Sequence, residues 1–199
     1  MNSTDSINIR TDLTRWLRRF EACTTDQNAR NYFRIYITGL ISQFPRKNCE
    51  AIALQASVPV RSVQWFLTRQ NWDHQKMRNK IQKIVAKEHP GKHSIGIIDE
   101  TRFIKKGTKT FGVQRQYCGT RGKKENCIGT VHLAYTVDNF HTLIDQDLFL
   151  PEAWDQDRDR CREAGVPDDV VYRPKWQIAL EQYDRATKNG IVFEWYSCP

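Results

Sequence analysis

Residues 94–99 have the sequence SIGIID, and the character of the chain changes at this stretch. A short apolar run that ends in an acid predicts a buried strand ending at Asp99. Before it, up to about residue 92, apolar residues recur at helical spacing. After it, β-branched and aromatic residues predict further strands at 113–119, 127–137, 140–144 and 191–196. The predicted fold class is therefore α+β, with an all-helical region at 1–92 followed by a mixed region at 93–199.

The helical region contains clear start and stop signals. Asp26, Asn48 and Asp73 each stand where a side-chain oxygen can cap the first turn of a helix. The predicted helices are 11–23, 27–44, 49–56, 60–69 and 74–87. One more amphipathic helix is predicted at 175–188, with a core-facing side made of Trp176, Ile178, Ala179, Leu180 and Tyr183.

The charge of the chain is positive and unevenly distributed. The formal net charge is +8, yet residues 1–92 hold 16 basic and 7 acidic residues, and residues 93–199 are close to neutral. A second basic block, 102–124, holds eight bases and no acid. This pattern indicates a polyanion such as nucleic acid, and the alternative is an ordinary solvated basic surface.

Other compositional features narrow the class of protein. No apolar run is long enough for a membrane span, and the first ten residues do not resemble a secretory signal. The six cysteines show no C-x-x-C spacing and indicate reduced thiols. We therefore expect a cytoplasmic protein without a zinc site and without a membrane partner.

Residues 48–69 have the proportions of a helix-turn-helix. The second helix would expose side chains suited to phosphates and base edges, among them Arg61, Gln64 and Arg69. The alternative interpretation is a structural helical hairpin, which is common in α-rich domains.

Asp99 is the candidate metal ligand. In enzymes that transfer polynucleotides, a carboxylate at the end of a buried strand helps to bind two Mg²⁺ ions, and two or three carboxylates must converge. Glu100 follows directly, but successive side chains of a strand point to opposite faces, so we expect it to point away. The alternative is an acid that merely precedes a turn.

Longer stretches carry a family resemblance. The segments IIDETRFIKKG at 97–107 and GVQRQYCGTRGKKENC at 112–127, together with 132–154 and 160–186, resemble the DDE-type transposases of bacterial insertion sequences, also described as DDE superfamily endonucleases. The likeness extends from about Thr11 to Trp195.

The resemblance implies a helical DNA-binding region and an RNase H-like catalytic core. It implies that Asp99 is the first catalytic aspartate and binds Mg²⁺, and that a second aspartate falls at or beyond Ser197 and a glutamate later still. The chain is thus expected to be C-terminally shortened and to lack two catalytic acids. Four lysines are expected to hold DNA phosphates: Lys105, Lys106, Lys123 and Lys124.

The partners implied are double-stranded DNA at transposon ends and a second chain, either another copy or a full-length transposase, in the bacterial nucleoid. Two alternatives stay open at this stage. One is a non-catalytic DNA-binding protein or inhibitor derived from a transposase, and the other is a decayed gene product without function.

Overall fold

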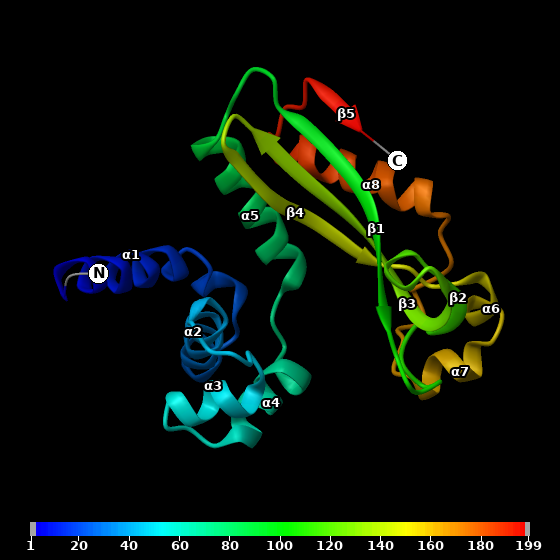
Figure 1. The fold of residues 1–199 in the computed structure, drawn as a ribbon, viewed down its shortest axis with the longest axis horizontal. Coiled ribbons are helices and arrows are strands. Elements are labelled where there is room, and N and C mark those ends of the chain that lie inside the picture. The colour runs from blue at the N-terminus through cyan, green and yellow to red at the C-terminus, as the bar shows by residue number, and fades with distance from the viewer. Residues whose placement is uncertain (1–2, 198–199) are drawn as a thin grey trace. The chain divides into compact units, whose positions relative to one another are not determined.

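The computed structural model describes residues 3–197 and divides the chain into two compact units, Met1–Met77 and Arg78–Pro199 (Figure 1). The first unit is helical and the second holds the sheet. The predicted helical region 1–92 covers the whole first unit and, in addition, a helix whose later turns pack on the sheet: Val85 belongs to the same core as strand residues Ile98 and Leu133.

Helices of the first unit begin where the sequence places their caps. Asp26 accepts a hydrogen bond from the backbone N–H of Ala29 at 2.8 Å, and Asn48 accepts one from Ala51 at 2.9 Å. The bond from Ala29 lowers the pKa of Asp26. The helices of the chain up to the sheet are α1 (Ser3–Arg18), η1 (Glu21–Cys23), α2 (Gln27–Ile41), α3 (Cys49–Gln55), α4 (Val60–Arg69) and α5 (His74–Glu88).

Aromatic rings fill the core of the first unit. Phe20 and Phe66 are almost completely buried, and Phe66 stacks on Trp72 with ring centroids 5.6 Å apart. Helices α2 and α3 approach closely at Gly39, because a Cβ there would lie 2.6 Å from Ile52 Cγ1. Helix α4 packs against both α2 and α3.

The sheet of the second unit is mixed and has five strands. They are β1 (Ile95–Ile104), β2 (Gln114–Cys118), β3 (Lys123–Val137), β4 (Phe140–Leu148) and β5 (Trp195–Ser197). Strand β3 pairs antiparallel with β1, β2 and β4, whereas β5 runs parallel to β1. A short 3-10 helix, η2 (Gly119–Arg121), lies between β2 and β3. Three α-helices follow β4: α6 (Glu152–Asp155), α7 (Arg158–Glu163) and α8 (Lys175–Lys188).

Helix α8 has the predicted bounds but buries a different face. Ile178 and Ala179 are buried as predicted, whereas Trp176, Leu180 and Tyr183 are 66%, 57% and 36% exposed, so that part of the prediction is wrong. Gln182 lies in the core instead, because its amide donates to the carbonyl of Val131 at 2.9 Å. A polar side chain can be buried there since the sheet supplies its hydrogen-bond partner.

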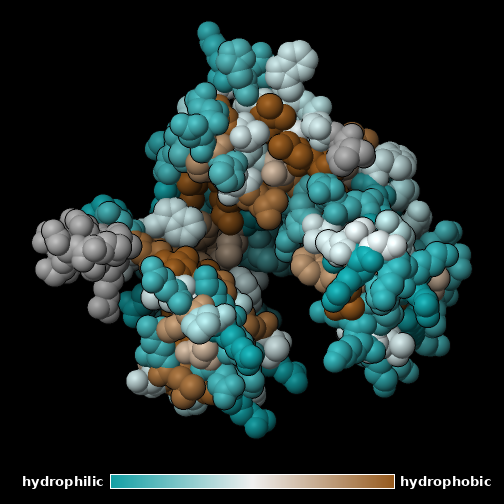
Figure 2. Space-filling view, viewed as in Figure 1, coloured by the Kyte–Doolittle hydropathy of each residue, from teal (hydrophilic) through white to brown (hydrophobic). Residues whose placement is uncertain are grey.

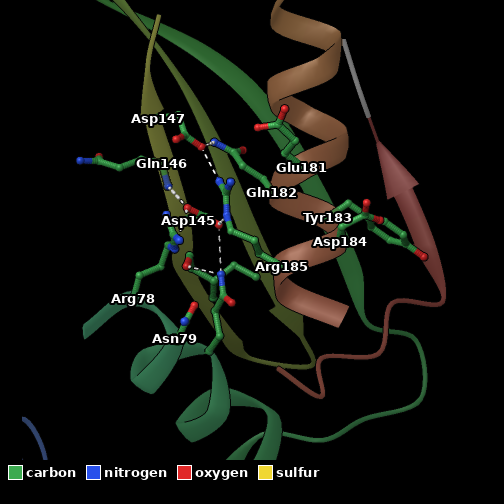
Figure 3. A network of polar contacts seen from close by, with 12 residues as sticks. Arg78, Asn79, Asp145, Gln146, Asp147, Glu181, Gln182, Tyr183, Asp184 and Arg185 are labelled. Atoms are coloured by element: carbon green, nitrogen blue, oxygen red, sulfur yellow. Dashed lines mark hydrogen bonds and ion pairs between the residues drawn. The ribbon is translucent and has the colours of Figure 1, made fainter. Parts of the chain in front are cut away.

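A network of charges joins α5, β4 and α8 (Figure 3). The side chain of Asp145 on β4 is fully buried and accepts from Nε of Arg185 at 2.9 Å and from the amide of Gln82 at 3.2 Å. Asp147 also binds Arg185 and accepts from Gln182 at 3.1 Å. Burial lowers the pKa of Arg185, but its hydrogen bond and charge interaction with Asp145 outweigh that effect and raise it.

Hydrophobic side chains remain exposed on the sheet-containing unit, and several are visible between hydrophilic ones in Figure 2. Within residues 3–197, no helix is long and apolar enough to cross a membrane.

We expect Asp145→Ala to lower the free energy of unfolding of the sheet-containing unit by about 3–5 kcal/mol, because it removes one partner of a buried ion pair. The control is Asp159→Ala, which removes a carboxylate of an exposed pair with Arg162 and should cost less than about 1 kcal/mol. Urea unfolding, followed through NMR signals of β3, measures both. Equal losses in the two variants would contradict the structural role of Asp145.

Candidate functional site

Asp99 lies in the middle of β1, not at its end. The strand continues for five more residues to Ile104, which pairs with Cys127 of β3. The predicted end at Asp99 is therefore wrong, because the apolar run stops there but the backbone pairing with β3 does not. The side chain of Asp99 is exposed, and its Oδ1 accepts from the backbone N–H of Glu100 at 2.7 Å.

The two neighbouring acids point to opposite faces, as predicted. Glu100 is bound by Lys175 of α8 at 2.6 Å and by Arg102 at 3.0 Å. Ile98, on the same side, packs into the core with Ile178 of α8. By strand alternation Asp99 faces away from α8. Glu100 is thus neutralised by its own partners and does not share a site with Asp99.

A histidine lies opposite Asp99, and the sequence did not single it out. His132 of β3 is the register partner of Asp99, so both side chains are on the same face of the sheet. His132 Nε2 lies 2.6 Å from Thr130 Oγ1, and that hydroxyl donates to the carbonyl of Thr101 at 3.1 Å. Burial lowers the pKa of His132, while the charge of Asp99 acts in the opposite direction. Only the strand register, which is not a local signal, could have revealed this pair.

Donor chemistry at this position partly fits a divalent cation. Asp99 offers a carboxylate oxygen, and the Nδ1 atom of His132 is buried without a hydrogen-bond partner in the described part of the chain. Within residues 3–197, no group of three or more His, Cys, Asp or Glu side chains converges as a metal site. Asp145 and Asp147 are occupied by Arg185 in the network of Figure 3.

The four predicted lysines lie at one end of the β1–β3 ladder. Lys106, Lys123 and Lys124 are exposed and Lys105 is half-buried. The backbone N–H of Lys105 donates to Asn126 at 2.8 Å, which continues the ladder past Ile104. At about 3.3 Å per residue, Lys105 lies roughly 20 Å along the strand from Asp99. The lysines therefore lie just past the end of β1 and at the start of β3, away from Asp99 in the middle of β1.

Helix α4 of the first unit presents a polar face. Val63 and Phe66 are buried, whereas the predicted DNA-contacting residues Arg61, Gln64 and Arg69 are exposed. The side chain of Trp65 is 61% exposed. A cavity of about 380 Å³ lies along this helix, lined by Asn28, Tyr32, Arg61, Ser62, Trp65, Phe66 and Gln70.

Comparisons with known proteins match most of the chain. A family model described as DDE superfamily endonuclease matches residues 19–196. The probable transposase for insertion sequence element IS701 of Microchaete diplosiphon is 37% identical over 100 residues, a match that covers 50% of this chain and 26% of that protein. The chain thus spans about a quarter of the length of this relative. No solved structure matches.

We expect the pKa of His132 to lie below its ordinary value of 6.5, because burial disfavours the imidazolium. Asp99→Asn should lower it further by removing a negative charge. Since the unfolded histidine keeps a higher pKa, the contribution of His132 to stability is complete above about pH 6.5 and falls as the pH drops through its folded pKa. An NMR titration of the imidazole C–H signals in EDTA measures the midpoint, and an upward movement in Asp99→Asn would contradict the assigned cause.

Proposed function

The chain belongs to the DDE superfamily endonucleases, and on that premise we propose that it is the DNA-binding and first catalytic part of an insertion-sequence transposase. The reaction class is cleavage of a DNA strand at the ends of the element and transfer of the freed 3′-OH to target DNA. The observation that carries the proposal is the family match over 19–196 combined with an exposed Asp99 on the central strand pair.

We propose that the sheet is the beginning of an RNase H-like core. Three features support this: β4, β3 and β1 are antiparallel neighbours, helix α8 follows, and β5 returns parallel to β1. In such a topology the parallel strand runs beside the strand that bears the first acid. Residue Ser197 pairs with Ile97, two positions before Asp99.

Asp99 is proposed as a ligand of Mg²⁺, whose carboxylate oxygen suits a hard cation. When bound, the metal supplies charge stabilisation for the attacking and leaving oxygens of phosphodiester chemistry. Asp99 would hold the ion. Glu100 stays out of the site because it forms ion pairs with Lys175 and Arg102.

The helical unit is proposed to bind duplex DNA in a helix-turn-helix-like manner. Helix α3, a turn with Ser57 at φ 52° and helix α4 have the required order, and Arg61, Gln64 and Arg69 are free of the core. Lys105, Lys106, Lys123 and Lys124 are proposed as phosphate contacts of the second unit. A second chain, another copy or a longer transposase, is part of the same proposal.

The first test of this function is salt-dependent DNA binding. Replacing Arg61 and Arg69 by Ala should weaken binding and reduce the slope of log K against log salt by roughly two, one per lost phosphate contact. The charge-matched control, Arg162→Ala with Lys188→Ala, removes two positive charges from the other unit. Fluorescence anisotropy with a duplex carrying the element's end measures both. Equal weakening by the two double variants would contradict a specific role of α4.

The second test is strand cleavage. Two-metal chemistry needs converging carboxylates, and on β1 and β3 alternation leaves Asp99 as the one acid on its face. We therefore expect residues 1–199 alone to bind but not cut a duplex in Mg²⁺ or Mn²⁺. Cutting that disappears in Asp99→Ala would overturn this expectation while supporting Asp99 as a ligand. If a longer version of the chain also bound the element ends without cutting them, the result would favour the alternative function of a DNA-binding protein or inhibitor.

A further inference from the structure

The cavity between α2 and α4 has an aromatic ring in its lining that no other ring covers. The side chain of Trp65 is 61% exposed and lines this cavity of about 380 Å³. Within the described residues its indole makes no ring contact, whereas Tyr32 and Phe66 in the same lining stack on each other with centroids 6.5 Å apart. The indole of Trp65 therefore offers a free π face on which another flat ring can stack.

Polar groups without protein partners share the lining with these rings. The amide nitrogen of Gln70 donates to Thr25 at 2.8 Å and to Asp26 at 3.0 Å. Because a carboxylate only accepts, this nitrogen must face Asp26, and the amide oxygen of Gln70 is left as an acceptor. The side chains of Asn28 and Ser62 also line the cavity and make no hydrogen bond within the described part of the chain. The lining thus offers donors and acceptors beside a flat apolar surface.

The charge around the cavity suits a polyanion. Among the described lining residues, Arg61 carries the one formal charge, and it is exposed. The acid that Gln70 binds, Asp26, also accepts from the backbone N–H of Ala29 and so serves as the cap of α2. Residues 1–92 hold 16 basic and 7 acidic residues, so this part of the chain attracts phosphates as a whole.

A base that is paired inside a duplex cannot use such a cavity. Its ring faces are covered by the neighbouring base pairs, and only its edge is accessible in a groove. A base that leaves the stack exposes its ring faces, and proteins bind such a base by stacking it on aromatic side chains and by hydrogen bonds to its edge. The cavity volume lies at the small end of the range typical of small-molecule sites, which suits one base rather than a run of bases.

We propose that the cavity between α2 and α4 accepts one unpaired base of bound DNA, with the indole of Trp65 as its stacking surface and the polar groups of Asn28 and Gln70 beside its edge. Arg61, at the same cavity, binds a phosphate of that strand. This inference rests on the proposed DNA binding by the helical unit and adds a site for a single nucleotide to it. The chain then prefers DNA in which a base is free to leave the stack, because extruding a paired base costs the free energy of unpairing.

The test uses the full chain and two short duplexes of equal length and charge. In one duplex an iodouracil base pairs with adenine, and in the other the same iodouracil faces an abasic site and can leave the stack. Fluorescence anisotropy measures the affinity for each duplex. Irradiation cross-links iodouracil to an aromatic ring stacked on it, and mass spectrometry locates the cross-link. We expect the duplex with the unpaired base to bind roughly tenfold more tightly, with the cross-link at Trp65.

Trp65→Ala should lower the ratio of the two affinities to about one and abolish the cross-link, whereas Trp65→Phe keeps a ring and should retain part of both. The matched control is Trp176→Ala, which removes an indole that is 66% exposed on α8 of the other unit. It should leave the ratio and the cross-link unchanged. If Trp65→Ala fails to fold, the cross-link in the native chain and the Trp65→Phe variant still decide the question.

The outcomes separate the two proposals. Equal affinity for the two duplexes, or a cross-link that maps outside the cavity, would overturn the base site alone, while salt-dependent binding of the paired duplex would stand. Absence of binding to either duplex at low salt would overturn DNA binding by this chain as well.

Discussion

The pairing of β1 with β3 is the constraint on which the sheet-containing unit depends. Ten consecutive residues of β1 are in register with β3, from Ile95 opposite Thr136 to Ile104 opposite Cys127. Because side chains alternate along both strands, this single register decides which residues share each face. A slip of one residue would exchange Ile98 with Asp99 and bury a carboxylate against α8.

The register separates two kinds of polar chemistry. On the α8 side, three acids each pair with a cation: Glu100 pairs with Lys175, and Asp145 and Asp147 pair with Arg185. On the opposite side Asp99 accepts only a backbone N–H, and the Nδ1 atom of His132 has no hydrogen-bond partner, in the described part of the chain. The first set stabilises the packing of helix on sheet, because each charge is satisfied. The second set has donor capacity left for a ligand.

Local features of the fold were predictable from the sequence, and non-local ones were not. The caps at Asp26 and Asn48 and the bounds of α4 and α8 depend on residues a few positions apart, and the structure has them. The end of β1 depends on how far β3 continues beside it, so the apolar run gave the wrong limit. The family likeness came from motifs along the chain, and the family match supports it.

The buried face of α8 also depends on non-local contacts, so the sequence alone did not predict it. Helical periodicity favoured Trp176 and Leu180 as core residues, since hydropathy is the only local guide. The sheet below instead offers the Val131 carbonyl and the Asp147 carboxylate, which satisfy Gln182 in the interior. The exposed face of α8 then holds Trp176 and Leu180.

This contrast also explains why an acid in a sheet is weak evidence of a metal site until its neighbours are known. Asp145 and Asp147 are carboxylates on a strand of the same sheet, as Asp99 is. They differ from Asp99 in having arginine partners that come from 38 to 40 residues away in the chain. A paired carboxylate must give up its cation before it can bind a metal ion, and for a fully buried one such as Asp145 that exchange would leave Arg185 uncompensated. Asp99 faces no such competition, which makes it the carboxylate of this sheet best able to bind an ion without disturbing the fold.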